Sequence, residues 1–278
     1  MWDQIMWDPS PIAFKLPFIE WPVTWYGVLF VSGILLSCFV LTHVLAATLK
    51  ISRPISLKIV DRFTWYMMIS ILVGARLGQV FFYYPSYYLS HPVDIFKIWE
   101  GGLASHGAAI AIPIGVWLFY RSYKKDLAPL SFLQFFDLFA ICVPVTCVFI
   151  RLGNFMNQEI IGYPSTLPWS ITFLHPLERL PPVSRHPVQL YEALAYFIIF
   201  VVLFTCWKKK WLQKPGSLIG LLFVLSFVSR FILEFFKEAQ SDYFTPWHLQ
   251  MGQLLSIPFI LLGMYLLFRK RSNVKFVS

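Results

Sequence analysis

Seven apolar segments, each close to the length of a bilayer-spanning helix, dominate this chain of 278 residues. A spanning helix needs about 20 mainly apolar residues. The third segment is the weakest, because glycines and His106 open it, and it can be one helix or a re-entrant piece followed by a helix. The pattern predicts an all-α polytopic membrane protein, a single domain over residues 1–278, with about seven transmembrane helices at 24–47, 63–84, 102–120, 131–150, 187–207, 217–236 and 249–268.

The composition excludes an ordinary soluble domain. Charged residues make up 13% of the chain, against about 25% in soluble proteins, and hydrophobic residues make up 58%. The first twenty residues lack the basic start and small-residue cleavage site of a signal peptide, so none is expected. No metal or organic cofactor is implied. The cysteines lie in apolar segments, with no CxxC pair and no His nearby at metal-ligand spacing, and are predicted to be core thiols: Cys38, Cys142, Cys147 and Cys206.

The basic residues indicate the orientation of the chain. Most of the 23 Lys and Arg residues follow the first, third, fifth and seventh spans, in clusters such as 50–62 and 208–214. The positive-inside rule therefore places the N-terminus outside and the C-terminus in the cytoplasm. The rule also accounts for the net charge of +9 without a nucleic-acid partner. On this orientation the proline-rich loop at 151–186 faces outward, where it is expected to form an ordered, extended cap over the outer face.

Three arginines lie within or at the end of the apolar segments: Arg76, Arg151 and Arg230. A guanidinium in the bilayer interior costs at least a few kcal/mol, so such residues by default mark a functional site. At about 1.5 Å of rise per helical residue, all three fall toward the outer leaflet, together with Tyr26 and His106. This convergence predicts an anion-binding site on the outer side of the membrane.

Each charged residue also has a structural reading. Arg76 can pair with a carboxylate to hold two helices together, and Glu192 can pair with an arginine. Arg230 and Glu234, four residues apart on one helix, can form an ion pair with each other.

The other polar residues have structural readings too. Tyr26 can be a tyrosine of the interfacial belt, and His106 a polar contact at a helix start. His186 is expected to cap the helix that follows it, and Asp137 to reach only the cytoplasmic interface.

The segment 151–162 is harder to explain by packing alone. Asn154, Asn157 and Glu159 follow Arg151 directly, so many hydrogen-bonding groups meet at one helix end. Gly162, like Gly153 before it, permits a close backbone approach or a positive φ.

Taken together, these motifs resemble the prolipoprotein diacylglyceryl transferase family. They occur in the family's order along nearly the whole chain, and the ordered set is specific although each motif alone is weak. The set comprises Trp25-Tyr26-Gly27, Gly74-Ala75-Arg76-Leu77-Gly78, Glu100-Gly101-Gly102 with Ser105-His106-Gly107, Arg151-Leu152-Gly153-Asn154-Phe155 with Asn157, Glu159 and Gly162, Arg185-His186-Pro187-Val188-Gln189-Leu190-Tyr191-Glu192, Arg230-Phe231 with Glu234-Phe235-Phe236, and Met251-Gly252-Gln253.

The resemblance implies an enzyme of the bacterial inner membrane. Such enzymes move the diacylglyceryl group of phosphatidylglycerol to the lipobox cysteine of a prolipoprotein signal peptide, and glycerol phosphate leaves. By motif, Arg151 and Arg230 are the phospholipid-binding arginines and His106 is the proposed base. The remaining matched positions, with catalytic or substrate-binding roles, are Tyr26, Arg76, Asn154, Glu159, Gly162 and Glu234.

The chain departs from the family pattern twice. Ala108 stands where a second glycine usually follows the His-Gly pair, so tighter packing is expected there. Ser226 stands where a tyrosine is common, four residues before Arg230, so the role of that phenol is lost or passes to a nearby tyrosine.

Reaction chemistry agrees with these residues. Arginine remains charged when partly desolvated and holds phosphate oxygens through paired hydrogen bonds. A transporter of anionic lipids or solutes also needs intramembrane arginines, but many transporters show internal repeats, and none is evident here. A structural membrane subunit leaves the arginines unexplained, and an intramembrane protease lacks its motifs.

Overall fold

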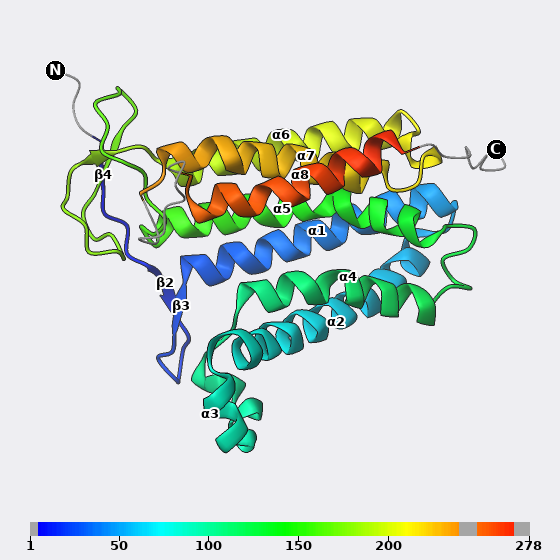
Figure 1. The fold of residues 1–278 in the computed structure, drawn as a ribbon, viewed down its shortest axis with the longest axis horizontal. Coiled ribbons are helices and arrows are strands. Elements are labelled where there is room, and N and C mark those ends of the chain that lie inside the picture. The colour runs from blue at the N-terminus through cyan, green and yellow to red at the C-terminus, as the bar shows by residue number, and fades with distance from the viewer. Residues whose placement is uncertain (1–4, 239–248, 270–278) are drawn as a thin grey trace. The chain divides into compact units, whose positions relative to one another are not determined.

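The computed structural model describes residues 5–238 and 249–269 and is mostly helical (Figure 1). Within this part of the chain, six helices are long and apolar enough to cross a membrane. The chain is therefore a polytopic membrane protein, as the sequence predicts. The six are α1 (Trp25–Leu49), α2 (Arg53–Gly78) continued by the π-helical turn Gln79–Tyr83, α5 (Phe132–Met156), α6 (Val188–Lys208), α7 (Ser217–Leu233) continued by the 3-10 turn Glu234–Phe236, and α8 (Met251–Phe268).

The third predicted span is a helix, but it is not one of these six. It forms α4 (Ser105–Ser122), which begins three residues later than the sequence pattern suggested. Gly101 and Gly102 precede it with φ values of 84° and 71°, a left-handed conformation that favours glycine. Two short 3-10 helices, Pro92–Phe96 and Ile98–Glu100, lead into this turn. The apolar run of α4 is short because polar residues occupy both of its ends.

The chain divides into two compact units, one of residues 41–136 and one of residues 1–40 with 137–278. In the first, α2 and α4 pack side by side (Figure 1). Their backbones come close at glycines, since a Cβ added to Gly107 would lie 2.7 Å from the Cα of Gly78. The short helix α3 (Pro85–Ser90) lies beyond the end of α2.

In the second unit, α7 packs against α6 and α8, and these helices run alongside α5 (Figure 1). The first part of α1 joins them through Ser37, whose hydroxyl bonds to Thr146 Oγ1 at 2.7 Å. The expectation that Asp137 only reaches the interface is wrong. Its carboxylate is buried and accepts the backbone N–H groups of Gly216 and Ile219, at the start of α7, at 2.5 and 2.9 Å. A side-chain acceptor at a helix start satisfies donors that have no partner within the helix.

The loop predicted at 151–186 begins only after Met156, because α5 continues to that residue. It contains β4 (Ile171–Phe173), which pairs in parallel with β1 (Ile5–Trp7) and antiparallel with β5 (Ser184–Arg185). A second hairpin joins β2 (Ile12–Lys15) and β3 (Pro22–Thr24). The fold is thus mostly helical rather than all-α. The sheet contributes to a small core made by Phe155, Ile161, Ile171 and Phe173, against which Trp7 packs.

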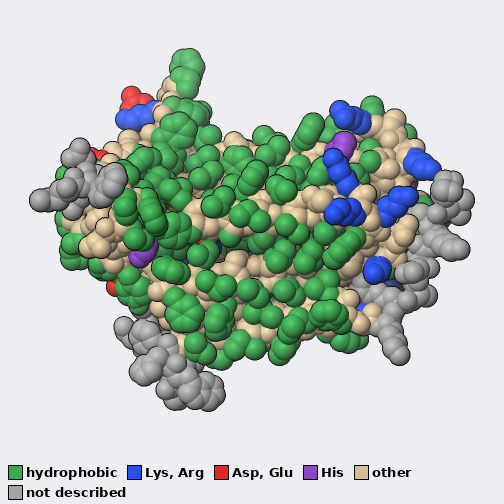
Figure 2. Space-filling view, turned by 90° about the horizontal axis from the view of Figure 1, so that it is seen from above, with side chains coloured by type: hydrophobic (Ala, Val, Ile, Leu, Met, Phe, Trp, Pro, Cys, Tyr) green, Lys and Arg blue, Asp and Glu red, His purple; other side chains and the backbone are tan. Residues whose placement is uncertain are grey.

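Large hydrophobic side chains cover much of the outer surface. They fill most of the face shown in Figure 2. On α1 and α2 alone, Leu35 and Trp65 are 65% and 64% exposed. Surfaces of this composition suit a lipid solvent, in which apolar side chains face outward.

Candidate active site

The polar segment 151–159 folds back on itself at the end of α5. Arg151 and Asn154 are three residues apart and share one helix face, so Nη1 of Arg151 donates to Oδ1 of Asn154 at 3.1 Å. Oε1 of Glu159 accepts hydrogen bonds from Nδ2 of Asn154 at 2.8 Å and of Asn157 at 3.2 Å. Gln158 has a φ of 51°, and this left-handed turn returns the chain so that Glu159 N–H reaches the carbonyl of Asn154. The predicted clustering of polar groups at this helix end is therefore present.

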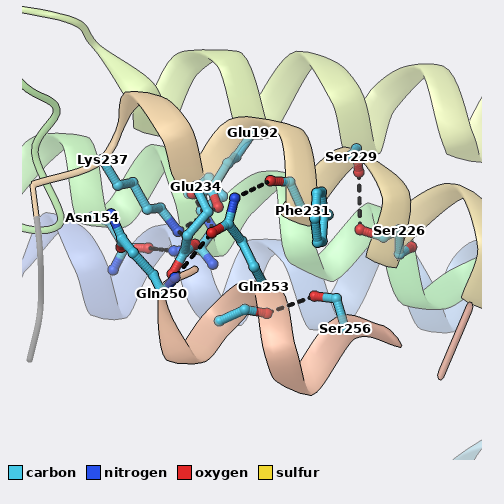
Figure 3. A network of polar contacts seen from close by, with 12 residues as sticks. Asn154, Glu192, Ser226, Ser229, Phe231, Glu234, Lys237, Gln250, Gln253 and Ser256 are labelled. Atoms are coloured by element: carbon cyan, nitrogen blue, oxygen red, sulfur yellow. Dashed lines mark hydrogen bonds and ion pairs between the residues drawn. The ribbon is translucent and has the colours of Figure 1, made fainter. Parts of the chain in front are cut away.

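A second element holds the other side of Arg151. Glu192, buried near the start of α6, places Oε2 2.9 Å from Nε of Arg151. The interpretation that Glu192 pairs with an arginine is confirmed. Its other oxygen, Oε1, lies 2.8 Å from Nζ of Lys237, so a single carboxylate joins two cations. Lys237 also pairs with Glu234 at 3.5 Å, and these side chains point toward one another in Figure 3.

Glu234 does not form the ion pair considered from the sequence. In the described part of the chain, no ion pair joins it to Arg230; its cation is Lys237, three residues further on. The 3-10 turn after α7 turns the chain at this point, so Glu234 and Lys237 face the same way. The start of α8 packs against Glu234, and Gly252 leaves room for the Glu234 carboxylate. The next residue, Gln253, donates to the carbonyl of Phe231 at 3.2 Å.

Arg230 differs from the other two arginines. Its side chain is half-buried, and among residues 5–238 and 249–269 its guanidinium makes no hydrogen bond or ion pair. Tyr196, from α6, interacts electrostatically with both Arg230 and Arg151 and hydrogen-bonds to Arg151. This tyrosine therefore lies near both arginines, whereas Ser226 has a buried hydroxyl without a partner among the described residues. An unpaired guanidinium in an apolar helix retains its full capacity to bind an anion.

Tyr26 approaches the same helix end from the start of α1. A Cβ added to Gly153 would lie 2.8 Å from Cδ2 of the Tyr26 ring, so the glycine provides the space that the ring occupies. Electrostatic interactions with Glu159 and Arg151 place the phenol close to both. Tyr26, Arg151, Asn154 and Glu159 thus form one polar cluster.

The chain matches the model of the family described as prolipoprotein diacylglyceryl transferase over residues 11–269. The chain belongs to this family. It is 42% identical to the phosphatidylglycerol–prolipoprotein diacylglyceryl transferase of Tolumonas auensis, over 95% of this chain and 96% of that one. It is 39% identical to the enzyme of that name from Chloroherpeton thalassium, covering 95% and 94% of the two chains, and 36% identical to that of Protochlamydia amoebophila, covering 96% and 95%.

Membership of the prolipoprotein diacylglyceryl transferase family confirms the activity predicted from the motifs: the protein is a transferase of lipoprotein biosynthesis. It also decides against a transporter or a structural subunit. The roles of single residues are not decided by the match and rest on geometry.

Two predicted site residues of this transferase belong to the other compact unit. Arg76 is buried and donates to five backbone carbonyls: Ile95 at 2.8 Å, Gly101 at 2.7 Å, Gly102 at 3.2 Å, Lys97 at 3.1 Å and Asp94. No carboxylate pairs with it among the described residues, so the predicted alternative of a helix-joining ion pair is wrong. Its guanidinium instead shapes the segment 94–102 that leads into α4.

His106 lies at the start of α4 and is exposed. Its Nδ1 is 3.4 Å from the hydroxyl of Tyr83, at the long end of hydrogen-bonding distance. Within the described part of the chain, this is the one hydrogen-bonding contact of the imidazole.

Gly162 and His186 meet behind the cluster. A Cβ on Gly162 would lie 2.5 Å from the carbonyl oxygen of His186 and 2.7 Å from that of Phe236, and its φ is not positive, so close approach is the reason for glycine. The predicted capping role of the His186 side chain is wrong: α6 has no side-chain cap at its start, and the ring contacts the hydroxyl of Tyr191 at 3.3 Å. Burial lowers the pKa of His186 below its usual value of 6.5.

Sequence reasoning missed Lys237. It also missed Gln189, whose fully buried side chain donates to the carbonyl of Glu159 at 2.7 Å. A lysine three residues after an intramembrane glutamate was the available signal for the first. For the second, only the family motif around residues 185–192 pointed to the position.

Proposed function

We propose that the enzyme binds phosphatidylglycerol with its phosphate between Arg151 and Arg230 and transfers the diacylglyceryl group to a lipobox cysteine. The observation that carries this proposal is the set of hydrogen-bond and ion-pair partners of the two guanidinium groups. Arg230 is unpaired among the described residues, and Arg151 is held by Glu192 at Nε and by Asn154 at Nη1, with Tyr196 as a further hydrogen-bond partner. Tyr196 interacts electrostatically with both side chains, which supports a shared anion site.

The reaction replaces one bond at the glycerol carbon. The sulfur of the lipobox cysteine attacks that carbon, the carbon–oxygen bond to phosphate breaks, and glycerol phosphate leaves with the bonding electrons. The thiol gives up its proton, and a thioether forms. The arginines stabilise the charge that grows on the leaving phosphate, which is the largest electrostatic change of the step. Because the nucleophile belongs to the substrate, the cysteines of the enzyme take no part.

The other residues of the proposal support this step. Asn154 and Glu159 fix the guanidinium of Arg151, and Tyr26 closes the same side of the cluster. A thiol with a pKa near 8.5 is mostly protonated at neutral pH, so a base accelerates its attack. His106 is our candidate for that base, and Arg76 contributes by holding the segment 94–102 before it.

The proposal includes the orientation of the protein in the bacterial inner membrane. With α4 counted as a seventh span, the basic clusters after alternate spans favour an outside N-terminus, a cytoplasmic C-terminus and a periplasmic cap formed by the loop at 151–186. The active site then opens toward the outer leaflet, where signal peptides emerge. A reporter active only in the cytoplasm, fused after residue 278, is expected to be active; an inactive but stable fusion would reverse this orientation.

The decisive experiment follows transfer of labelled diacylglyceryl from phosphatidylglycerol to a lipobox peptide by the purified enzyme. Arg151→Ala and Arg230→Ala are each expected to lower kcat/KM at least about a hundredfold, the usual effect of removing one preorganised donor to a developing anion. Arg121→Ala is the control, because Arg121 lies near the other end of α4 and stacks on Trp117. Turnover by both variants at the parent's rate would refute the arginine site while leaving the family assignment intact.

A pH profile tests the proposed base. His106→Gln is expected to lower kcat and to change the pH dependence of kcat, because a general base must be unprotonated to accept the thiol proton. An unchanged profile in the folded variant would assign the proton transfer to another group.

A further inference from the structure

Lys237 lies in a position that a lysine rarely occupies. Only 4% of its side chain is exposed, and it is enclosed by two equally buried glutamates: Nζ is 2.8 Å from Oε1 of Glu192 and 3.5 Å from Oε2 of Glu234 (Figure 3). Lysines are almost never fully buried unless they are paired. The chain has therefore placed a cation where it meets two anions.

The backbone around Lys237 holds this side chain in place. Residue 237 forms an antiparallel bridge with Gly162, and the neighbouring residues add hydrogen bonds from Tyr163 N–H to the Phe236 carbonyl at 2.9 Å and from Glu238 N–H to the Ile161 carbonyl at 3.1 Å. Glu238 is further fixed by Arg185 at 2.6 Å. The position of Nζ is therefore set by two chain segments rather than by a free loop.

The buried group of two cations and two carboxylates has no net charge. Arg151 and Lys237 carry two positive charges, and Glu192 and Glu234 carry two negative ones. Glu192 faces both cations, so Lys237 takes up part of a carboxylate charge that would otherwise fall on Arg151 alone. Oε2 of Glu234 has no hydrogen-bond partner among the described residues, and Lys237 is the cation within ion-pair distance of it. A buried carboxylate that loses its cation costs several kcal/mol.

We propose that Lys237 is a positioning residue that keeps Arg151 electrostatically available to an anionic lipid headgroup. Because Lys237 also pairs with Glu192, the carboxylate does not fully neutralise Arg151, and the guanidinium keeps a net positive potential that attracts the phosphate. Without Lys237, Glu192 neutralises Arg151, and Glu234 is left as an uncompensated buried negative charge. Lys237 does not itself touch the substrate in this proposal. The inference rests on the proposed phosphate site at Arg151.

The test compares Lys237→Met, Lys237→Arg and the double variant Glu192→Gln/Lys237→Met in the transfer assay, with KM for phosphatidylglycerol and kcat determined separately. Loss of the lysine is expected to raise KM about tenfold or more, because unit charges a few ångströms apart interact strongly where water is excluded. Arginine at 237 is expected to stay within about threefold of the parent, because the charge is retained. Lys15→Met, which removes an exposed lysine from β2, is the control and is expected to leave KM unchanged.

The double variant separates charge balance from packing. It removes one positive and one negative charge and so restores the balance, and its KM is expected to be lower than that of Lys237→Met by about threefold or more. A purely structural lysine would give the opposite result, since a second core substitution adds to the damage of the first.

The outcomes distinguish this inference from the proposed function. Full activity of Arg151→Ala refutes the phosphate site and this role of Lys237 with it. If Arg151→Ala is inactive but folded Lys237→Met keeps the parent's KM, the role of Lys237 alone is refuted. If Lys237→Met does not fold, the comparison passes to Lys237→Gln and the double variant, and a double variant no better than the glutamine single variant overturns the proposal.

Discussion

Gly162 provides the sharpest test of how the cluster is assembled. The substitution Gly162→Ala adds a Cβ that would lie 2.5 Å from the carbonyl oxygen of His186, 2.7 Å from its Cβ and 2.7 Å from the carbonyl oxygen of Phe236. Favourable separations are about 3.5–4.0 Å between carbon atoms. None of these three atoms is the end of a flexible side chain, so the two chain segments themselves must move apart.

The magnitude follows from two contributions. Overpacking a tight site costs about 1–3 kcal/mol. Moving residue 162 also weakens the hydrogen bond from Nη1 of Arg185 to its carbonyl, now 3.1 Å, and such charged bonds contribute about 1.5–3 kcal/mol. The sum is a loss of roughly 2.5–6 kcal/mol, which for a chain of this size lowers the melting temperature by on the order of 5–25 °C.

Thermal unfolding in detergent and the transfer assay measure the two consequences. The activity of Gly162→Ala is expected to fall even below its melting temperature, because residue 162 bridges to Lys237 and so helps to place the buried charges. Gly27→Ala is the matched control: its nearest neighbour, Thr24 Oγ1, lies at an ordinary 3.4 Å, and alanine is favoured over glycine inside a helix. If Gly162→Ala retained the melting temperature and activity of the parent, the close approach would not be rigid and this reasoning would fail.

Two further predictions concern neighbouring side chains. Glu159→Gln keeps one acceptor oxygen but loses the charge that draws in the amides of Asn154 and Asn157, so its kcat/KM is expected to fall about tenfold, and that of Glu159→Leu further, in the same transfer assay. The lowered pKa of His186 means that the unfolded chain binds this proton more readily, so stability is complete above pH 6.5 and declines as pH falls from 6.5 toward the lowered value; melting curves across that range should show the slope, and His186→Asn should remove it.

The membrane architecture was predictable because it depends on composition alone. Runs of about 20 apolar residues have few alternatives to a spanning helix. The segment 63–84 became α2 and its π-helical extension, and 187–207 became α6, with ends within a few residues, except that α2 starts at Arg53. The apolar pattern did not mark that earlier start, because the polar first turns of α2 interrupt the hydrophobic run.

Pairing of charges was less predictable, because the choice among several partners is made in three dimensions. The i,i+4 spacing of Arg230 and Glu234 suggested an ion pair, but the chain leaves the α-helix at residue 234, and the 3-10 turn brings Lys237 to the glutamate instead. Arg76 has five backbone carbonyl partners that only a folded loop can supply. Local spacing therefore identified which residues are polar in the membrane, but not what they bind.

Asp137 shows the same limit at the opposite end of α5. Its position in sequence suggested an interfacial carboxylate, whereas the fold brings the start of α7, eighty residues later, onto it. Nothing near Asp137 in sequence encodes this contact. The signal lies at the other end of the contact, in Gly216. Its φ of 83° begins α7, and the backbone N–H groups there donate to the carboxylate of Asp137.

Asp137→Ala is therefore expected to destabilise the protein without changing its chemistry. Two buried N–H groups lose their acceptor, at about 1–3 kcal/mol each, and the positive end of the α7 dipole loses a negative charge. Unfolding in detergent should show a loss of roughly 2–6 kcal/mol, with Asp137→Asn in between because one amide oxygen still accepts. At temperatures where the variant is folded, KM for phosphatidylglycerol should match the parent's.

Asp126→Ala is the control, because Asp126 lies in the turn after α4 and is exposed. A raised KM in folded Asp137→Ala would mean that the start of α7 is coupled to Arg230 along the helix, and that the two ends of α7 do not act independently.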